Sequence, residues 1–254
     1  MLFRSGGLWG ASTGLLLAAL RPAHRGPLLI LTADDVDSLQ LQTDLAAFGI
    51  PSHVLPREEL GDDGLPDPGT KSARQRALQH HTADQAPLLC GIEALLQKVA
   101  TPKSLQRAQL ELHSGQTLDR TQVLQKAQAA GLRSVPLVLA PGECSVRGDI
   151  VDLFPMAADQ AVRLEFFDRT LESIRTFDPS SQRTIAVHER FLLALGQSEL
   201  ADEGSVLRHL TPSRTLVVAY EPLRIEERQA RVLAFTPDLS RTLQDVQDTL
   251  QPCA

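Results

Sequence analysis

Short apolar runs alternate with helical patterns through the first hundred residues. The runs PLLILT (27–32) and PLLCGI (87–92) show no alternation of polar and apolar positions, which is typical of strands buried on both faces. After Asp34 or Asp35 the apolar residues follow a helical spacing, and Gly49 closes that helix. The other elements predicted in this part are a helix at 12–20, a strand at 52–56, a loop at 60–69, and helices at 70–82 and 93–100. Strands separated by helices predict a parallel α/β sheet of the doubly wound kind.

The pattern changes near residue 102. A helix with a cap at each end, Asp119 and Gly131, comes first. It is followed by three β segments, at 144–155, 161–167 and 171–177. Because the connections between these segments are short and polar, we expect an antiparallel meander.

The last part of the chain returns to the first pattern. An apolar run at 215–220 predicts a buried strand, and Pro222 stands in the first turn of the helix that follows. The sequence thus predicts an α/β domain made of residues 1–101 and 190–254, interrupted by a small α+β domain at 102–189.

Composition narrows the class of protein. The chain has 254 residues and a net charge of −6, whereas proteins that grip a phosphate backbone usually present a basic field. The three cysteines, Cys90, Cys144 and Cys253, are too widely spaced for a disulfide framework or a CxxC metal site. The run after Arg4 has too short an apolar core for a signal peptide, and no run is long enough to span a membrane. We therefore expect a cytoplasmic protein.

The stretch GLWGASTGLLLAAL near the start has the layout of a phosphate-binding loop that leads into a helix. A working loop needs a lysine for the terminal phosphates and a Ser or Thr for Mg²⁺, but the first lysine in the chain is Lys71. Asp34 and Asp35 are better explained as helix-capping residues than as magnesium ligands. We therefore interpret the loop as degenerate and expect no cofactor, no metal and no ATP hydrolysis; its residues are Gly10, Ala11, Ser12, Thr13 and Gly14.

No catalytic group stands out. His80 and His81 are adjacent, so on a helix they point about 100° apart, and we expect surface residues rather than metal ligands. No Ser/His/Asp or Cys/His pair has a local signature, so we predict no catalytic residue.

The second predicted strand of the meander has an unusual outer face. In VRLEFF, alternation places Arg163, Glu165 and Phe167 on one face, opposite an apolar face made of Val162, Leu164 and Phe166. An arginine beside an exposed aromatic is typical of a protein-binding hot spot. The alternative is that Phe167 packs under a helix and the arginines only solvate the sheet, and the pattern alone does not decide between them.

The preceding segment, 144–155, extends this face. Arg147 and Asp149 share one side of it, while Asp152 falls among apolar neighbours, which suggests a bulge. The tripeptide RGD at 147–149 lies inside the predicted strand, so an adhesion function is excluded.

A family resemblance rests on PGECSVRGDIVDLFP and VRLEFFDRTLESIRTFDPSSQRT. These stretches closely resemble the UvrA-binding domain shared by the excision-repair protein UvrB and the transcription-repair coupling factor. The flanking LLCGIEALLQKVATP and LRHLTPSRTLVVAYEPLRIEERQARVL are more weakly similar to the coupling factor. The opening loop also looks more like that protein's degenerate loop than like the intact Walker sequence of UvrB.

The resemblance implies a function and a site. It implies that residues 1–101 and 190–254 form a vestigial RecA-like domain and that residues 102–189 form a UvrB-type domain that binds UvrA. Arg147, Arg163 and Phe167 match the positions that contact UvrA in the family, with Asp149 and Glu165 on the same face. The predicted function is a non-enzymatic adaptor of nucleotide-excision repair.

Further partners and alternatives follow from the same resemblance. We expect other domains of a full-length coupling factor as further partners, and neither sequence-specific nucleic-acid binding nor membrane association. One alternative is a DNA-binding or helicase-related part of a larger ATP-driven translocase, whose motor would lie beyond Ala254. Another is a truncated decoy that occupies UvrA.

Overall fold

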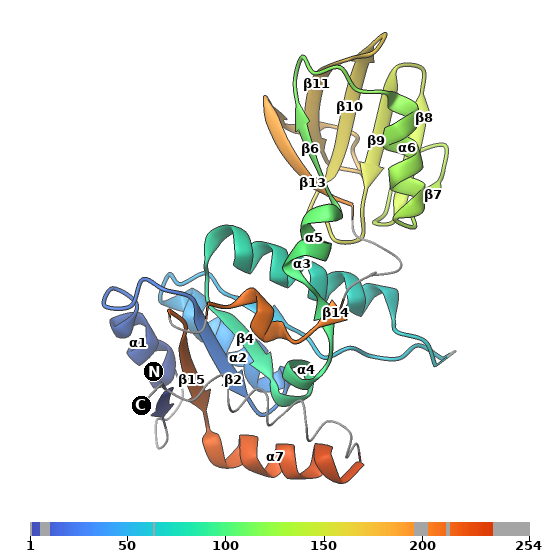
Figure 1. Cartoon of the computed structure of the whole chain (residues 1–254). Helices are drawn as coiled ribbons and strands as arrows, with labels where there is room; N and C mark the ends of the chain where they lie inside the picture. Colours follow the sequence, from blue (N-terminus) through green and yellow to red (C-terminus); the bar gives the residue numbers. More distant parts are fainter. Residues whose placement is uncertain (1, 6–10, 63, 196–202, 212–213, 236–254) are drawn as a thin grey trace. The chain divides into compact units, whose positions relative to one another are not determined.

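The chain divides into two units, one of which is formed by two separate stretches of sequence. The computed structural model describes residues 2–5, 11–62, 64–195, 203–211 and 214–235 (Figure 1). The first unit comprises Met1–Pro102 and Glu203–Ala254, and the second comprises Lys103–Asp202. The second unit therefore interrupts the first along the sequence.

A five-stranded parallel sheet is the centre of the first unit. Its strand order is β1-β15-β2-β4-β3, and every neighbouring pair is parallel. The strands are β1 (Leu2–Ser5), β2 (Leu28–Thr32), β3 (His53–Leu55), β4 (Leu88–Gly91) and β15 (Leu216–Tyr220). The buried strands β2 and β4 are the two unalternating apolar runs, and the predicted α/β fold with a parallel sheet is confirmed.

Helices and short elements complete this unit. They are α1 (Ser12–Leu20), α2 (Asp35–Ala47), α3 (Pro68–Asp84), α4 (Ile92–Leu96), β5 (Val99–Ala100), β14 (Glu203–Gly204), η1 (Val206–His209) and α7 (Pro222–Phe235). The predicted helix at 93–100 is wrong in its second half, because Val99 and Ala100 pair with β14 instead. The side chain of Asp67 accepts a hydrogen bond from the Thr70 amide and caps α3.

The core of this unit lies between the sheet and its helices. Ile30, Leu45 and Leu89 are completely buried there. On α2, however, Val36 is 74% exposed and Leu39 is 54% exposed, so these two apolar positions of the helical pattern do not face this core.

His81 is buried, which contradicts the expected surface location. It lies on a buried stripe of α3 that also carries Arg74, Ala77 and Leu78, at a helical spacing. Because Arg74 and His81 are polar, this stripe is not visible as a pattern of apolar residues in the sequence. Arg74 is 4% exposed and donates hydrogen bonds to the backbone oxygens of Pro56 and Lys98. Polar residues with such partners can thus line a core face.

A six-stranded sheet with the order β12-β11-β10-β9-β8-β7 forms the second unit. Its strands are β7 (Arg133–Ser134), β8 (Glu143–Arg147), β9 (Ile150–Phe154), β10 (Ala161–Phe167), β11 (Thr170–Phe177) and β12 (Thr184–His188). From β8 to β12 each strand pairs antiparallel with the next along the chain, so the expected meander is confirmed. The other elements are α5 (Pro102–Arg107), α6 (Arg120–Ala129) and the antiparallel pair β6 (Gln109–His113) and β13 (Arg190–Ala194).

One face of this sheet is buried. Val162, Leu164 and Phe166 of β10 pack in a core that includes Val123 and Ala127 of α6. Figure 1 shows α6 alongside β8 and β9. Alternation along β10 therefore turns the opposite set of side chains toward the other face.

Candidate protein-interaction surface

The face of the six-stranded sheet opposite this core is called the outer face below. It carries Ser145, Arg147, Asp152, Arg163, Glu165, Phe167 and Arg175. Cross-strand register explains their proximity, since Asp152 lies opposite both Ser145 on β8 and Arg163 on β10. Residues opposite one another on a sheet face have Cβ atoms about 5 Å apart, so side chains from neighbouring strands can interact.

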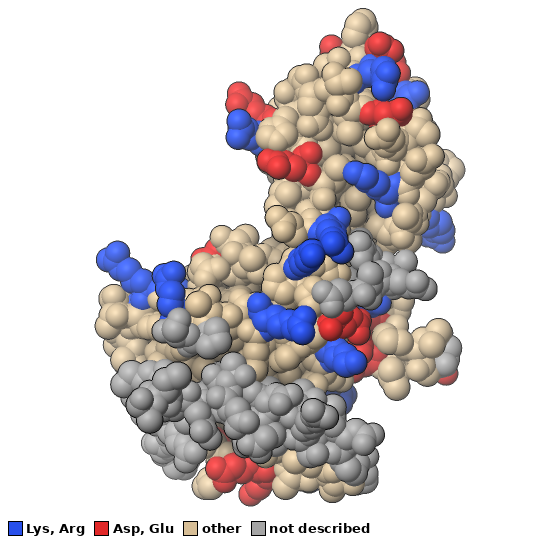
Figure 2. All heavy atoms as spheres, in the orientation of Figure 1, with Lys and Arg blue, Asp and Glu red and all other residues tan. Residues whose placement is uncertain are grey.

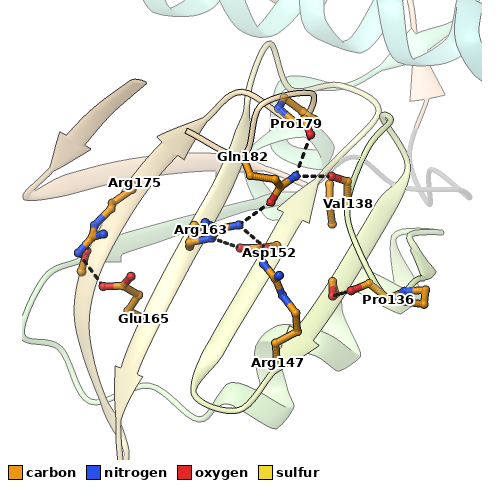
Figure 3. Close-up of polar contacts among 11 residues, drawn as sticks. Pro136, Val138, Arg147, Asp152, Arg163, Glu165, Arg175, Pro179 and Gln182 are labelled. Carbon is orange, nitrogen blue, oxygen red and sulfur yellow. Dashed lines mark hydrogen bonds and ion pairs between the residues drawn. The ribbon is translucent and has the colours of Figure 1, made fainter. Parts of the chain in front are cut away.

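Two of the predicted site residues converge on Asp152. Arg163 donates from Nε to Asp152 Oδ1 at 2.7 Å and from Nη2 to Oδ2 at 2.8 Å, a bidentate pair. Arg147 donates from Nη2 to the same Oδ2 at 2.8 Å. Figure 3 shows the two guanidinium groups approaching this carboxylate from the flanking strands. Asp152 is fully buried, so its charge is balanced by these arginines rather than by bulk water.

Arg163 is the less accessible of the two arginines. Its side chain is 16% exposed, against 45% for Arg147. It also donates to Gln182 Oε1 at 2.8 Å, and its guanidinium carbon lies 4.5 Å from the ring centre of Phe177. The hydrogen bonds to Asp152 raise the pKa of Arg163 above its ordinary value, while burial opposes that rise. The guanidinium is therefore charged and held in one orientation.

Gln182 connects this arginine to the loop before β8. Its Nε2 donates to the carbonyl oxygens of Val138 and Pro179, at 3.1 and 2.8 Å (Figure 3). Val138 packs with Phe177 in a small cluster that covers one end of the outer face. The end that carries Phe167 is not covered in this way, because Phe167 is 71% exposed.

A second ion pair lies beside the first. Arg175 donates from Nη2 to Glu165 Oε2 at 2.8 Å and from Nε to Ser173 Oγ at 2.9 Å. Both charged side chains are partly exposed, at 37% for Arg175 and 28% for Glu165. The pair is neutral overall, so the accessible positive charge of the outer face comes mainly from Arg147.

The RGD segment is a turn rather than part of a strand, which corrects the prediction. Arg147 ends β8, Gly148 and Asp149 form the turn, and Ile150 begins β9. Gly148 has φ of +60°, a conformation that glycine adopts without strain at the first position of a tight hairpin turn. The turn, not a bulge, thus brings Asp152 onto the same face as Arg147.

Asp149 lies away from the other predicted residues and pairs with a residue of α6. Its side chain is 75% exposed and accepts a hydrogen bond at 3.0 Å from Arg120, the first residue of α6. It therefore lies at the hairpin end, where it joins the turn to the helix. The other predicted residues lie on the strands.

Asp152, Arg175 and Gln182 belong to this surface or support it, although the sequence pattern did not identify them. The available signal was Asp152 itself, a single acid inside the apolar run IVDLF. A carboxylate buried in a strand requires charged or hydrogen-bonding partners. Those partners come from other strands, and their pairing depends on a register that periodicity alone does not provide.

The glycine-rich loop is only partly within the described residues, since residue 10 lies outside them. Ala11 caps α1 without a side-chain hydrogen bond, and Ser12 begins the helix. Thr13 is 1% exposed. A Cβ on Gly14 would come within 3.2 Å of Asp44 Cβ and of the Phe48 ring, so this glycine permits close packing of α1 on α2. Helix packing therefore accounts for Gly14 without a phosphate.

The described residues were also compared with the requirements of a metal site, a membrane span and a charged surface patch. Within the described residues, no group of three or more His, Cys, Asp or Glu side chains could hold a metal ion. Among the helices described, none is long and apolar enough to cross a bilayer. On the face seen in Figure 2, acidic and basic side chains stand beside one another in the upper part of the second unit, and basic side chains alone are seen in its lower part.

Comparison with known proteins places this surface in a family context. Residues 110–194 match the family model described as the UvrB interaction domain. The chain is 37% identical over 213 residues to the transcription-repair-coupling factor of Myxococcus xanthus, a match covering 79% of this chain and 18% of that protein. Against the coupling factor of Escherichia coli K12 the identity is 32% over 184 residues, covering 71% and 16%.

A second protein type also matches. The UvrABC system protein B of Chlorobaculum tepidum is 32% identical over 152 residues, which cover 56% of this chain and 22% of that protein. The chain thus spans less than a quarter of the length of each of these relatives.

Proposed function

Because residues 110–194 belong to the UvrB interaction domain family, we propose that this chain is a protein-binding component of nucleotide-excision repair that docks onto UvrA. The docking site is the outer face of the six-stranded sheet. The observation that carries the proposal is the exposure of Phe167, 71%, on a sheet face that also presents the Arg147 guanidinium. Aromatic residues and arginine are both enriched at protein interfaces.

We assign the roles on that face by exposure. Phe167 fills an apolar pocket of the partner, and Arg147 pairs with a carboxylate there through the N–H groups that Asp152 leaves unused. Arg163 lies beneath them and contributes its charge and one accessible edge. Asp149 and Glu165 lie at the margin, each paired with an arginine of this chain.

The two units have different roles in this proposal. The second unit is the UvrA-binding domain, and the first is a RecA-like α/β domain whose degenerate loop needs no nucleotide. The chain itself acts as a non-enzymatic adaptor, and any motor of the coupling factors belongs to their remaining length.

Binding between the 254-residue chain and UvrA, measured by calorimetry, tests the proposal. The informative variant is Arg147→Ala/Phe167→Ala, because both side chains are exposed and their removal leaves the buried Asp152–Arg163 pair in place. We expect binding by the unmodified chain and a loss of at least about tenfold in the variant. Arg190→Ala/Leu192→Ala on exposed positions of β13 is the matched control and should bind normally. No binding by the unmodified chain would refute the proposed function.

A further inference from the structure

We propose that Asp152 is a positioning residue for the UvrA-binding face: it holds the guanidinium groups of Arg147 and Arg163 at a set separation that the partner recognises. This inference rests on the proposed function. Asp152 is fully buried and cannot itself be the main contact, yet its two oxygens receive three hydrogen bonds from the two arginines.

The geometry makes Asp152 the link between the arginines. Arg147 lies on β8 and Arg163 on β10, with β9 between them. Neighbouring strands are about 4.8 Å apart, and Arg147 lies two residues along β8 from Ser145, which is level with Asp152 and Arg163, so the two arginine backbones are separated by roughly 12 Å. Both side chains nevertheless end on the one carboxylate of the middle strand. Their charged groups are therefore closer together than their backbones.

Without Asp152, Arg147 has no fixed orientation. In the described part of the chain, its side chain makes its one hydrogen bond to Asp152 Oδ2. An unrestrained arginine loses rotamer entropy when a partner orders it. Ordering the side chain before the partner arrives removes part of that cost, which strengthens binding without adding a contact.

A negative charge under the arginines is otherwise unfavourable for binding an acidic partner. Asp152 cancels one of the two positive charges next to it and so weakens long-range attraction. Two explanations of the face therefore give opposite expectations for Asp152→Asn. If net charge decides affinity, the substitution strengthens binding; if positioning decides it, the substitution weakens binding.

Glu165→Gln is the matched control. It removes one negative charge from the same face, as Asp152→Asn does, but it acts on the partly exposed Glu165–Arg175 pair. Association and dissociation rates with UvrA should be measured by surface plasmon resonance at two salt concentrations. We expect Asp152→Asn to raise the dissociation rate about tenfold or more, whereas Glu165→Gln changes mainly the association rate, by about threefold or less.

A double-mutant cycle separates positioning from general damage to the fold. If Asp152 acts through Arg147, Asp152→Asn should weaken binding far less in an Arg147→Ala background than in the unmodified chain. The inference would be overturned if Asp152→Asn weakened binding by the same factor in the Arg147→Ala background as in the unmodified chain. Dissociation rates that are equal for Asp152→Asn and Glu165→Gln would also overturn it.

A second substitution covers the case in which Asp152→Asn does not fold. Asp152→Glu keeps the charge and moves the carboxylate by one methylene, so the pairs form at an altered position. We expect it to remain folded by circular dichroism and still to dissociate several-fold faster; a folded variant that dissociates at the normal rate refutes the inference. If the unmodified chain does not bind UvrA, that result refutes the proposed function, and it is distinct from a result in which the unmodified chain and the Asp152 variants bind equally well.

Discussion

Phe166 and Phe167 are neighbours on β10 with opposite environments: Phe166 is 5% exposed and Phe167 is 71% exposed. The strand alternates its side chains between the core of the second unit and the outer face, so one ring stabilises the fold and the other is available to a partner. Two adjacent residues of the same type thus allow the stability of the fold and the proposed binding to be tested separately.

We therefore predict that alanine substitutions at these two positions have contrasting effects on stability and on binding. Phe166→Ala should lower the free energy of unfolding of the second unit by about 3–5 kcal/mol, because it leaves a cavity in the core. Phe167→Ala should change that free energy by less than about 0.5 kcal/mol and weaken UvrA binding by about tenfold or more. Urea unfolding and calorimetry on both variants are the measurements. A strong loss of stability in Phe167→Ala would mean that its ring packs within the chain.

The two arginines on Asp152 should differ in a similar way. Arg163→Ala removes two of the three hydrogen bonds on a buried carboxylate. Breaking a buried ion pair costs about 3–5 kcal/mol, and we expect the lower end because Arg147 remains. Arg147→Ala leaves the bidentate pair intact, so its cost should be about 1 kcal/mol.

Hydrogen exchange of the β10 peptide in increasing urea measures this difference within the second unit. Arg190→Ala is the control, since Arg190 is exposed on β13. Equal losses for Arg147→Ala and Arg163→Ala would contradict the assignment of Arg163 as the less exposed and more strongly paired of the two arginines on Asp152.

Two histidines of the first unit, the buried His81 and the half-buried His209, give a pH dependence. His81 and His209 each use one ring nitrogen on a backbone oxygen, of Ala86 and Ala100 respectively, both at 2.7 Å. The other nitrogen of each ring is buried and has no hydrogen-bond partner in the described residues. Burial lowers the pKa of both histidines below the ordinary value of 6.5, since a protonated ring would carry an uncompensated charge.

The sign of the effect follows from linkage. Between the lowered pKa of the folded state and about 6.5, the unfolded chain binds more protons, so the stability of the first unit should fall as the pH drops below about 6.5. Above that pH the histidines contribute no pH dependence. Hydrogen exchange of the α3 peptide at pH 5, 6 and 7.5 tests this, and His81→Gln should flatten the profile. An unchanged profile in that variant would exclude His81 as the source.

The periodicity of apolar residues was sufficient to predict an element where the burial of its side chains follows that pattern directly. The unalternating runs at Leu28–Thr32 and Leu88–Gly91 became neighbouring parallel strands, and alternation identified the outer face of β10. It failed where a polar residue occupies a core position or where a turn is short. Arg74 and His81 continue the buried stripe of α3, and the turn at Gly148 divides what looked like one strand.

The contacts among Arg147, Asp152 and Arg163 could not be predicted from periodicity, for a different reason. These three residues come from three strands, and their contacts depend on cross-strand register, which the Gly148–Asp149 turn sets. A reading of residues 144–155 as a single strand separates Arg147 from Asp152 by five positions and hides their contact. The family resemblance supplied Arg147 and Arg163, but not the carboxylate between them.

The reactivity of the two buried cysteine thiols tests whether both units stay closely packed in solution. Cys90 and Cys144 are each completely buried, and burial raises the pKa of Cys90 to about 12 and that of Cys144 above its ordinary value. Because the thiolate is the reactive species, neither residue should react with an aromatic disulfide reagent at pH 8 in the folded chain. Both should react fully after addition of guanidinium chloride, with the labelled peptides identified by mass spectrometry. If Cys144 is labelled without denaturant while Cys90 is not, the second unit opens while the first stays closed, and the interaction surface must then be described as an ensemble rather than as one arrangement.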